Sequence, residues 1–310
     1  MSPAQIIVNP FAGRWKARAA LPAIEHACQA ISLPYELAIT EGKGHATTLA
    51  HEAALAGRFP IIVAGGDGTI NEVVNGLIKA TPDGPAGPLG IIPLGSADDL
   101  AYALGLETGV EAACQVVLAG HTRLIDVGQV NGRLFCNNSS VGLEPQVTLM
   151  QERIRGIKGA PRYILAAFRS IFGHSPWHMQ LEWDEGEYDG PITLVSVGNT
   201  RRAGGAFHMT PGAEIDDGYL DFCFAGHLTR ARLLRLLPTT FSGAHVQQPD
   251  VEYTRATRLR ITSEPPTPLQ CDGEVFDLAA EQIEYAILPR RLEVLVPDRR
   301  DDRDRFDPIR

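Results

Sequence analysis

A cluster of glycines around one acid has the composition of a phosphate-binding loop. The sequence reads Gly65-Gly66-Asp67-Gly68-Thr69 directly after an apolar, strand-like run. Glycines let a phosphate approach the backbone without a Cβ in the way, and the N-terminus of a following helix favours an anion. Asp67 would repel that phosphate unless a divalent cation lay between them. The pattern therefore favours a joint site for phosphate and Mg²⁺ over a strand–helix turn without a ligand.

Further loops of similar composition follow other strand-like runs. They are Asn9–Gly13, Thr40–His45 and Pro93–Asp99. In a parallel α/β sheet, such loops meet at the carboxyl ends of the strands, where ligands bind. The chain contains neither the G-x-x-x-x-G-K-[ST] pattern of P-loops nor the G-x-G-x-x-G pattern of dinucleotide sites. Together with the loop at Asp67, these loops predict a nucleotide site of another type.

A second pair of acids, Asp272 and Glu274, flanks Gly273 late in the chain. One carboxylate on such a turn could act as a general base for a hydroxyl group while the other orients metal or water. On spacing alone, a solvated acidic turn is the better explanation. The residues by themselves leave both interpretations open.

The first part of the chain alternates short apolar strands with amphipathic helices. This alternation is typical of a parallel sheet covered by helices on both faces. The helix that follows the first strand is expected to have Pro22 near its start. Strands are expected at 6–8, 35–40, 60–64 and 89–93, and further helices at 45–56, 69–79, 97–104 and 110–119.

The pattern changes after Arg123, because strand-like runs then follow one another. The dipeptide Asn131-Gly132 between two such runs is favoured in a type I′ hairpin turn. Consecutive strands indicate an antiparallel sheet or sandwich, interrupted by a helix for which Thr229 is the expected N-cap. We therefore predict a nucleotide-binding α/β domain at 1–123, a β-rich domain at 124–296 and a charged, solvated tail at 297–310.

Composition and charge narrow the class of protein. A formal net charge of −9 argues against nucleic-acid binding, which normally needs a basic surface. The five cysteines form no CxxC pair, as expected for reduced thiols in the cytosol. No signal peptide is recognisable, and no apolar run approaches the ~20 residues that cross a bilayer. We expect a cytoplasmic protein without a transmembrane segment that reaches any membrane substrate from the water side, with a homodimer among its expected assembly states.

A basic stretch with aromatic residues is a candidate for membrane contact. Such a helix can lie on anionic headgroups at roughly 1 kcal/mol per basic residue. More often, a helix of this kind packs its apolar face into its own core. The basic residues are Arg153, Arg155, Lys158, Arg162 and Arg169, and the apolar ones are Tyr163, Ile164, Ala167, Phe168, Ile171 and Phe172.

Taken together, these motifs resemble the diacylglycerol kinase catalytic domain family, which includes bacterial lipid kinases and sphingosine kinases. The resemblance implies an N-terminal α/β domain like those of phosphofructokinase and NAD kinase, a C-terminal antiparallel β-sandwich, and ATP bound between them. The matching segments are Asn9–Gly13 (N-P-x-x-G), Gly65–Thr69 (G-G-D-G-T), Pro93–Ala101 (P-x-G-T-x-N-D-x-A), Gly198-Asn199 with Pro211 and Asp217–Leu220, and Asp272–Glu274 (D-G-E).

The resemblance also implies roles for individual residues, with ATP and Mg²⁺ as cofactors. Glu274 would be the general base, with Asp272 as its neighbouring carboxylate, and we expect the metal-bound triphosphate at Asp67 to face Glu274 across a cleft. A structural Mg²⁺ would be held by Asp217, the carbonyl of Tyr219 and Glu214. Nucleotide contacts are expected from Asn9, Pro10, Gly13, Thr40, Gly65, Gly66, Asp67, Gly68, Thr69, Asn71, Glu72, Gly95 and Ser96.

The chain departs from the family pattern in a few places. Ser96 stands where Thr is usual and keeps the hydroxyl group. Asp98 replaces the usual Asn and adds a negative charge, and Glu144 stands where G-x-D is common and lengthens a carboxylate arm. We predict an ATP-dependent kinase that acts on the hydroxyl group of diacylglycerol or a related lipid at a membrane surface. The alternatives are an NAD kinase, which shares G-G-D-G-T, and a catalytically weak nucleotide-binding regulator.

Overall fold

The computed structural model describes residues 3–154, 156, 160–173 and 176–298, with the backbone alone at 152 and 160–164. Its contacts divide the chain into two compact units. The first unit contains the residues up to Ile125 and, in addition, those from Arg291 onward. The second unit is Asp126–Arg290. The sequence placed the boundary near Arg123 and ended the second domain at 296, so it did not foresee that the chain returns to the first unit.

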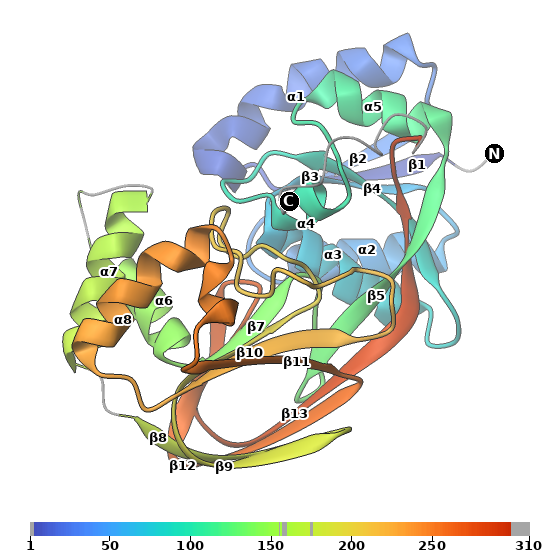
Figure 1. Ribbon diagram of the computed structural model, residues 1–310. Helices are drawn as coiled ribbons and strands as arrows, with labels where there is room; N and C mark the ends of the chain where they lie inside the picture. The colour runs from blue at the N-terminus through green and yellow to red at the C-terminus, as the bar shows by residue number, and fades with distance from the viewer. Residues whose placement is uncertain (1–2, 155, 157–159, 174–175, 299–310) are drawn as a thin grey trace. The chain divides into compact units, whose positions relative to one another are not determined.

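A parallel sheet forms the centre of the first unit (Figure 1). The apolar strands β1 and β3 are buried along their whole length, as expected where helices cover both faces of a sheet. The last residues of β13 pair in parallel with β4, with Leu292 opposite Ala86, and so complete this sheet. Its strands are β1 (Ala4–Val8), β2 (Tyr35–Ile39), β3 (Ile61–Gly65), β4 (Ala86–Pro93) and the end of β13 (Glu274–Leu295), in the order β13-β4-β3-β1-β2.

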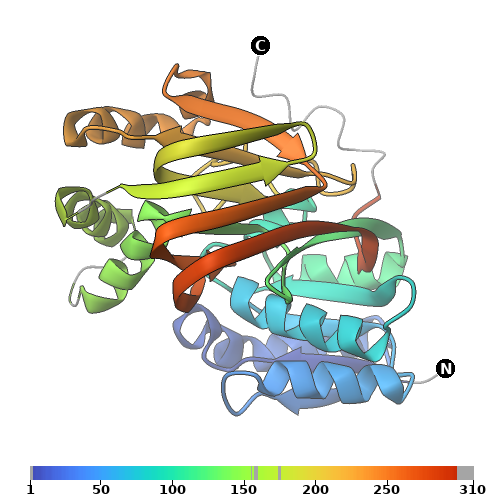
Figure 2. The same cartoon turned by 90° about the horizontal axis from the view of Figure 1, so that it is seen from below.

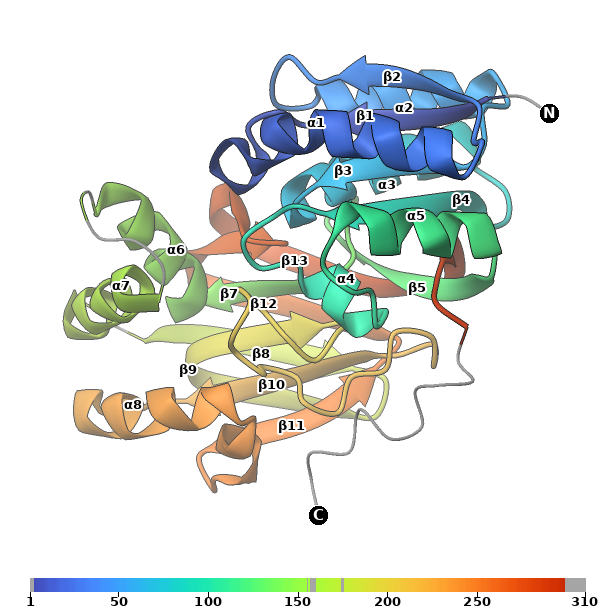
Figure 3. The ribbon, with the colours of Figure 1, turned by 90° about the horizontal axis from the view of Figure 1, so that it is seen from above.

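Helices cover both faces of this sheet. Figures 2 and 3 view the structure from opposite sides and show α2 and α3 on one face and α1 and α5 on the other. The helices are α1 (Ala12–Ala30), α2 (His45–Leu55), α3 (Asp67–Ala80), α4 (Asp99–Ala103) and α5 (Val110–Ala119).

The expectation that Pro22 lies near the start of a helix was wrong. Gly13, Arg14 and Trp15 have positive φ values, so the regular part of α1 begins at Lys16, and Pro22 lies beyond its first turn. Proline there removes one backbone hydrogen bond of the helix. Buried residues such as Ile24 and Cys28, which pack against the sheet and α5, keep this region helical.

The second unit is an antiparallel sheet that folds into two layers. The long strands β9 and β12 each pair with β7 along one part and with β8 along another. This sharing turns the sheet back over its own apolar face, where Phe135, Trp177 and Phe222 are among the buried residues. The strands are β5 (Thr122–Val130), β6 (Arg133–Phe135), β7 (Asn138–Gly142), β8 (Trp177–Trp183), β9 (Gly186–Gly198), β10 (Leu220–Gly226), β11 (Val251–Ala256), β12 (Arg258–Cys271) and β13.

The predicted local signals of the second unit are confirmed. Asn131 and Gly132 have φ values of 46° and 81°, which the type I′ turn between β5 and β6 requires. The hydroxyl group of Thr229 accepts a hydrogen bond from the N–H of Arg232 and caps α8. The sequence missed α6, which begins directly after β7. The helices are α6 (Leu143–Arg153), α7 (Ala160–Gly173) and α8 (Arg230–Leu236), followed by the 3₁₀ helices η1 (Leu237–Phe241) and η2 (Ala244–Gln247).

Within the described residues, no helix is both long enough and apolar enough to cross a bilayer. Most of the predicted charged tail, residues 299–310, lies outside the described part of the chain, as do Arg155 and Lys158 of the basic stretch.

Candidate active site

The loop that contains Asp67 joins β3 to α3, and its carboxylate is tied to a neighbouring loop. Asp67 is the first residue of α3, two residues earlier than expected. Its Oδ1 accepts hydrogen bonds from the backbone N–H groups of Asp99 (2.8 Å) and Leu100 (3.3 Å), at the start of α4. The carboxylate therefore satisfies backbone donors that would otherwise be free at a helix start. This fixes the two glycine-containing loops to each other.

A second contact brings the N-P-x-x-G loop to the same place. The side-chain N–H of Asn9 donates to Oγ1 of Thr69 (2.9 Å), and Oδ1 of Asn9 accepts from the N–H of Phe11. The structure thus brings Asn9, Asp67 and Thr69 together at the carboxyl edge of the parallel sheet, where ligands bind in such folds.

The glycine loops approach each other so closely that a side chain would not fit. A Cβ on Gly66 would lie 2.9 Å from Cα of Gly95, and a Cβ on Gly95 would lie 2.6 Å from Cα of Gly66. Both distances are shorter than real Cβ contacts, so the glycines are needed here for close packing of the loops. Gly68 and Ser96 are exposed beside them.

Glu72, another predicted nucleotide contact, supports a neighbouring loop. Its Oε1 accepts from the N–H of Gly44 (2.8 Å) and its Oε2 from the N–H of Ala46 (3.2 Å). These donors lie at the start of α2, at the end of the loop that begins with the buried Thr40. Glu72 therefore shapes the Thr40–His45 loop through its backbone.

Asp98 closes the loop that it belongs to. Its Oδ1 accepts from the N–H of Gly95 (2.8 Å), and its φ of 51° lies in the left-handed region that Asn and Asp adopt more readily than other residues. The extra negative charge relative to Asn is thus committed to a backbone hydrogen bond.

In the second unit, Asp272 and Gly273 form the two-residue loop of a hairpin between β12 and β13. Their φ values are 44° and 79°, and Cys271 pairs with Glu274 across the turn. This is the Asp-Gly form of a type I′ turn, a signal that the sequence analysis did not use. The turn places Glu274 at the first position of the long strand β13.

The Asp272 carboxylate holds this turn in place. Its Oδ2 accepts from the N–H of Cys136 (2.9 Å), and its Oδ1 accepts from the N–H groups of Asn137 (2.9 Å) and Asn138 (3.1 Å). An ionised acceptor makes stronger hydrogen bonds than a neutral one. These contacts support a scaffolding role for Asp272; its predicted catalytic role stays a prediction.

Glu274 is paired with an arginine that the sequence analysis did not single out. Nη2 of Arg133 lies 2.6 Å from Oε2 of Glu274, and the two side chains are 32% and 37% exposed. The guanidinium group also lies over the ring of Phe276, 4.9 Å from its centroid. Arg133 directly follows the Asn131-Gly132 turn, but no local pattern links it to a residue 141 positions later.

Glu144 is the second residue of α6, in the second unit. Its Oε1 accepts from the side-chain N–H groups of Gln270 (3.0 Å) and Asn138 (3.4 Å). Its Oε2 is shielded from solvent and has no hydrogen-bond partner within the described part of the chain. Burial raises the pKa of Glu144 to about 7, although Ser196, Ser140 and Gln270 oppose this shift.

An apolar cavity of ≈ 90 Å³ lies between the sheet of the second unit and its helices. It is smaller than the apolar cavity of roughly 150 Å³ that is known to bind benzene, so it has room for only a few carbon atoms. Glu144 and His245 are polar groups in its wall, and burial lowers the pKa of His245. The apolar wall includes Leu143, Val147, Ala167, Ile171, Leu233 and Leu236.

The residues predicted to hold a structural Mg²⁺ lie in one segment of the second unit. Oδ1 of Asp217 accepts from the N–H of Tyr219 (3.0 Å), and Oδ2 lies 3.7 Å from Arg255. Asp217 and Asp216 also raise the pKa of the nearby Asp126, in addition to the larger effect of burial. This concentration of oxygen donors and negative charge suits Mg²⁺. In the described ranges, however, no group of three or more His, Cys, Asp or Glu side chains is arranged to hold a metal ion.

Comparison with protein families gives matches along both units. Residues 3–130 match the family model of the diacylglycerol kinase catalytic domain. Residues 137–296 match the model of the YegS C-terminal NAD kinase beta sandwich-like domain.

Similar proteins cover nearly the whole chain. The chain is 31% identical to a diacylglycerol kinase of Bacillus subtilis over 96% of its own length and 97% of that protein. It is 34% identical to a probable lipid kinase YegS-like protein of Chromohalobacter salexigens over 84% and 83% of the two lengths.

Solved structures show the same fold. A diacylglycerol kinase from Bacillus anthracis superposes with a TM-score of 0.72 at 22% identity, covering 96% of this chain and 97% of that one. An NAD kinase from Archaeoglobus fulgidus in complex with ATP has a TM-score of 0.54 at 13% identity, covering 96% and 94%. At these identities, the likeness concerns the fold alone.

Proposed function

The chain belongs to the diacylglycerol kinase catalytic domain family and is therefore a lipid kinase, and we propose that it transfers the γ-phosphoryl group of ATP to a hydroxyl group of diacylglycerol or a related lipid. The loops at Asn9, Asp67 and Gly95 bind the nucleotide as its Mg²⁺ complex. Glu274, in the second unit, acts as the general base.

One observation supports a lipid as the acceptor. The side-chain N–H of Asn138 donates to Glu144 in the wall of the apolar cavity, and its backbone N–H donates to Asp272 in the turn that carries Glu274. Asn138 thus contacts both the turn that carries the predicted base and a residue in the wall of the apolar cavity. The end of an acyl chain can bury apolar surface in such a cavity, whereas a dinucleotide acceptor does not require one.

In the proposed reaction, the lipid hydroxyl oxygen attacks the γ-phosphorus as Glu274 takes its proton. The bond between the γ-phosphorus and the oxygen that bridges to the β-phosphate breaks, and ADP leaves. Backbone N–H groups of the glycine loops would stabilise the charge on the transferring group. Asp217, the Tyr219 carbonyl and Glu214 could hold a further Mg²⁺, which would supply positive charge to a segment rich in acids.

A panel of acceptors tests the proposal. Purified protein and radiolabelled ATP are incubated with diacylglycerol, sphingosine, phosphatidylglycerol or NAD, with Glu274→Gln as the blank. Labelled lipid from the wild type alone is the expected result. Labelled NADP would favour the NAD kinase alternative, and Mg·ATP binding without transfer to any acceptor would favour a nucleotide-binding regulator.

We further propose that α7 contributes to contact with the membrane. Phe168 and Phe172 are 46% and 47% exposed, and their ring centroids lie 4.6 Å apart. The guanidinium group of Arg230 lies over the ring of Phe172. Ala167 and Ile171, on the same helix, are buried. The helix thus packs one face into the second unit and leaves an aromatic pair with a nearby cation outside, a composition suited to an anionic lipid surface.

Sedimentation with phosphatidylglycerol vesicles tests this surface. The double variant Phe168→Ser/Phe172→Ser should bind fewer vesicles than the wild type. Leu55→Ser is the matched control, because Leu55 is an exposed apolar residue (67%) on α2 in the other unit. Equal sedimentation of both variants would exclude α7 from membrane contact.

A further inference from the structure

The turn that carries Glu274 is held by one short segment, residues 133–138. Its backbone N–H groups at Cys136, Asn137 and Asn138 bind the Asp272 carboxylate. Its first residue, Arg133, binds the Glu274 carboxylate through a contact of 2.6 Å. Both acids of the turn are therefore fixed by the same short segment, one by backbone groups and the other by a side chain.

Arg133 is itself held in place from several directions. The hairpin before it is tied to β13, because the Asn131 side chain donates to the carbonyl of Gln282 and accepts from the N–H of Glu284. The guanidinium group lies over the Phe276 ring, and Leu134 and Phe135, which follow Arg133, are buried. An arginine restrained in this way loses little additional freedom when it binds a carboxylate.

We propose that Arg133 is the positioning residue for Glu274 in phosphoryl transfer. By binding Oε2, it fixes the rotamer of Glu274 and directs the other oxygen, Oε1, to the acceptor hydroxyl group. This inference rests on the proposed role of Glu274 as the general base.

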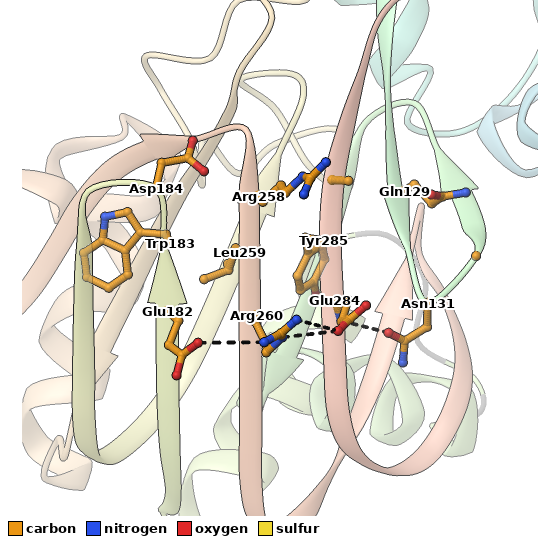
Figure 4. A pocket seen from close by; sticks show the side chains of 12 residues that line it. Gln129, Asn131, Glu182, Trp183, Asp184, Arg258, Leu259, Arg260, Glu284 and Tyr285 are labelled. Atoms are coloured by element: carbon orange, nitrogen blue, oxygen red, sulfur yellow. Dashed lines mark hydrogen bonds and ion pairs between the residues drawn. The ribbon is translucent and has the colours of Figure 1, made fainter.

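The same sheet offers a matched control. Arg260 on β12 lies between two glutamates, 4.0 Å from Glu182 and 3.1 Å from Glu284 (Figure 4). All three side chains are more than 60% exposed, and neither glutamate belongs to the predicted site. Arg260→Met therefore removes an arginine–glutamate contact in the same unit without touching the turn at Glu274.

Kinetics form the first arm of the test. Arg133→Met should lower kcat by roughly ten- to a hundredfold, as expected for misplacement of a general base. KM for Mg·ATP should stay unchanged. Arg133→Lys, which keeps the charge, should restore part of kcat, whereas Arg260→Met should match the wild type in both kcat and KM.

Chemical labelling forms the second arm and needs no acceptor lipid. A water-soluble carbodiimide activates carboxyl groups through their protonated form, and mass spectrometry reports modification at Glu274. At a fixed pH, Glu274 should react faster in Arg133→Met than in the wild type, Arg133→Lys or Arg260→Met, because the guanidinium group no longer contacts its Oε2. Equal melting temperatures of the two methionine variants would show that the difference is not caused by unfolding.

The possible results distinguish a failure of the proposed role of Arg133 from a failure of the proposed lipid kinase activity. Faster labelling in Arg133→Met, together with no lipid phosphorylation by the wild type, would support the pairing and refute the proposed function. An active wild type whose Arg133→Met variant keeps the same kcat and labelling rate would refute the role of Arg133. A loss of kcat that Arg260→Met shares equally would refute it as well, because the effect would then be a general one on the sheet.

Discussion

Two glycine-containing turns in this chain each carry an aspartate, and the aspartates are used alike. Asp67 accepts hydrogen bonds from backbone N–H groups at the start of α4, and Asp272 accepts them from residues 136–138. The turns differ in what stands next to the aspartate. Asp67 lies between glycines and begins α3. Asp272 is followed after one glycine by Glu274, which pairs with Arg133. The difference supports the proposal that the first turn receives an anion and the second presents a base.

The largest expected effect comes from removing the base. Glu274→Gln keeps the size and shape of the side chain but cannot accept the proton. We expect kcat for lipid phosphorylation to fall by about 10²–10⁴-fold, the usual contribution of general base catalysis. A lipid phosphorylation assay measures this change, with Glu281→Gln, an exposed glutamate on the same strand, as the control. A Glu274→Gln enzyme with wild-type kcat would contradict the assignment.

A smaller effect is expected on the stability of the second unit through Glu144. Its pKa in the folded state is raised to about 7 from 4.5, so the folded state binds a proton more tightly than the unfolded one. The tighter proton binding adds to the free energy of unfolding. This added stability is fully present below pH 4.5 and is lost as the pH rises through about 7. Since one pKa unit corresponds to roughly 1.4 kcal/mol, the loss is about 3 kcal/mol at most.

Glu144→Gln, which cannot ionise, should lack this part of the pH dependence. Urea unfolding at several pH values between 4.5 and 8 compares the variant with the wild type. The two curves should diverge steadily with pH, the variant being the more stable at pH 8. Parallel curves would show that Glu144 does not titrate in this range.

Close packing of the glycine loops predicts a moderate effect of substitution there on the affinity for Mg·ATP. A Cβ on Gly66 would lie 2.9 Å from Cα of Gly95, so Gly66→Ala must push two loops apart. We expect the Kd for Mg·ATP to rise about tenfold, or roughly 1.4 kcal/mol. Calorimetric titration measures the Kd, and Gly173→Ala is the control, since a Cβ there meets no atom within 4 Å. An unchanged Kd in Gly66→Ala would mean that these loops do not bind the nucleotide.

The smallest effect is expected at Asp98. Its carboxylate accepts from the N–H of Gly95, and an Asn side-chain oxygen can make the same hydrogen bond at the same positive φ. Asp98→Asn should therefore change kcat and the Kd for Mg·ATP by no more than about twofold, within the range of a single retained hydrogen bond. A large gain in either quantity would show that the extra charge weakens nucleotide binding after all.

The sequence predicted what depends on local patterns. The buried strands β1 and β3, the Asn131-Gly132 hairpin and the Thr229 cap follow from spacing and residue type within a few positions. The pairing of Arg133 with Glu274 depends on the register of β5, β6 and β13, which no local pattern specifies. The return of Leu292–Leu295 to the first sheet has the same cause, since a strand carries no signal that selects its partner. Pro22 was misplaced because tertiary packing keeps the surrounding residues helical.

Binding of Mg·ATP to two variants tests most directly the division of roles between the two turns, with nucleotide binding at Asp67 and the general base at Glu274. The Kd is measured by calorimetry for the wild type, Asp67→Asn and Glu274→Gln under identical conditions. Asp67→Asn should bind Mg·ATP at least about tenfold more weakly, and Glu274→Gln should bind it with the wild-type Kd. Weakened binding in Glu274→Gln together with wild-type binding in Asp67→Asn would contradict this division.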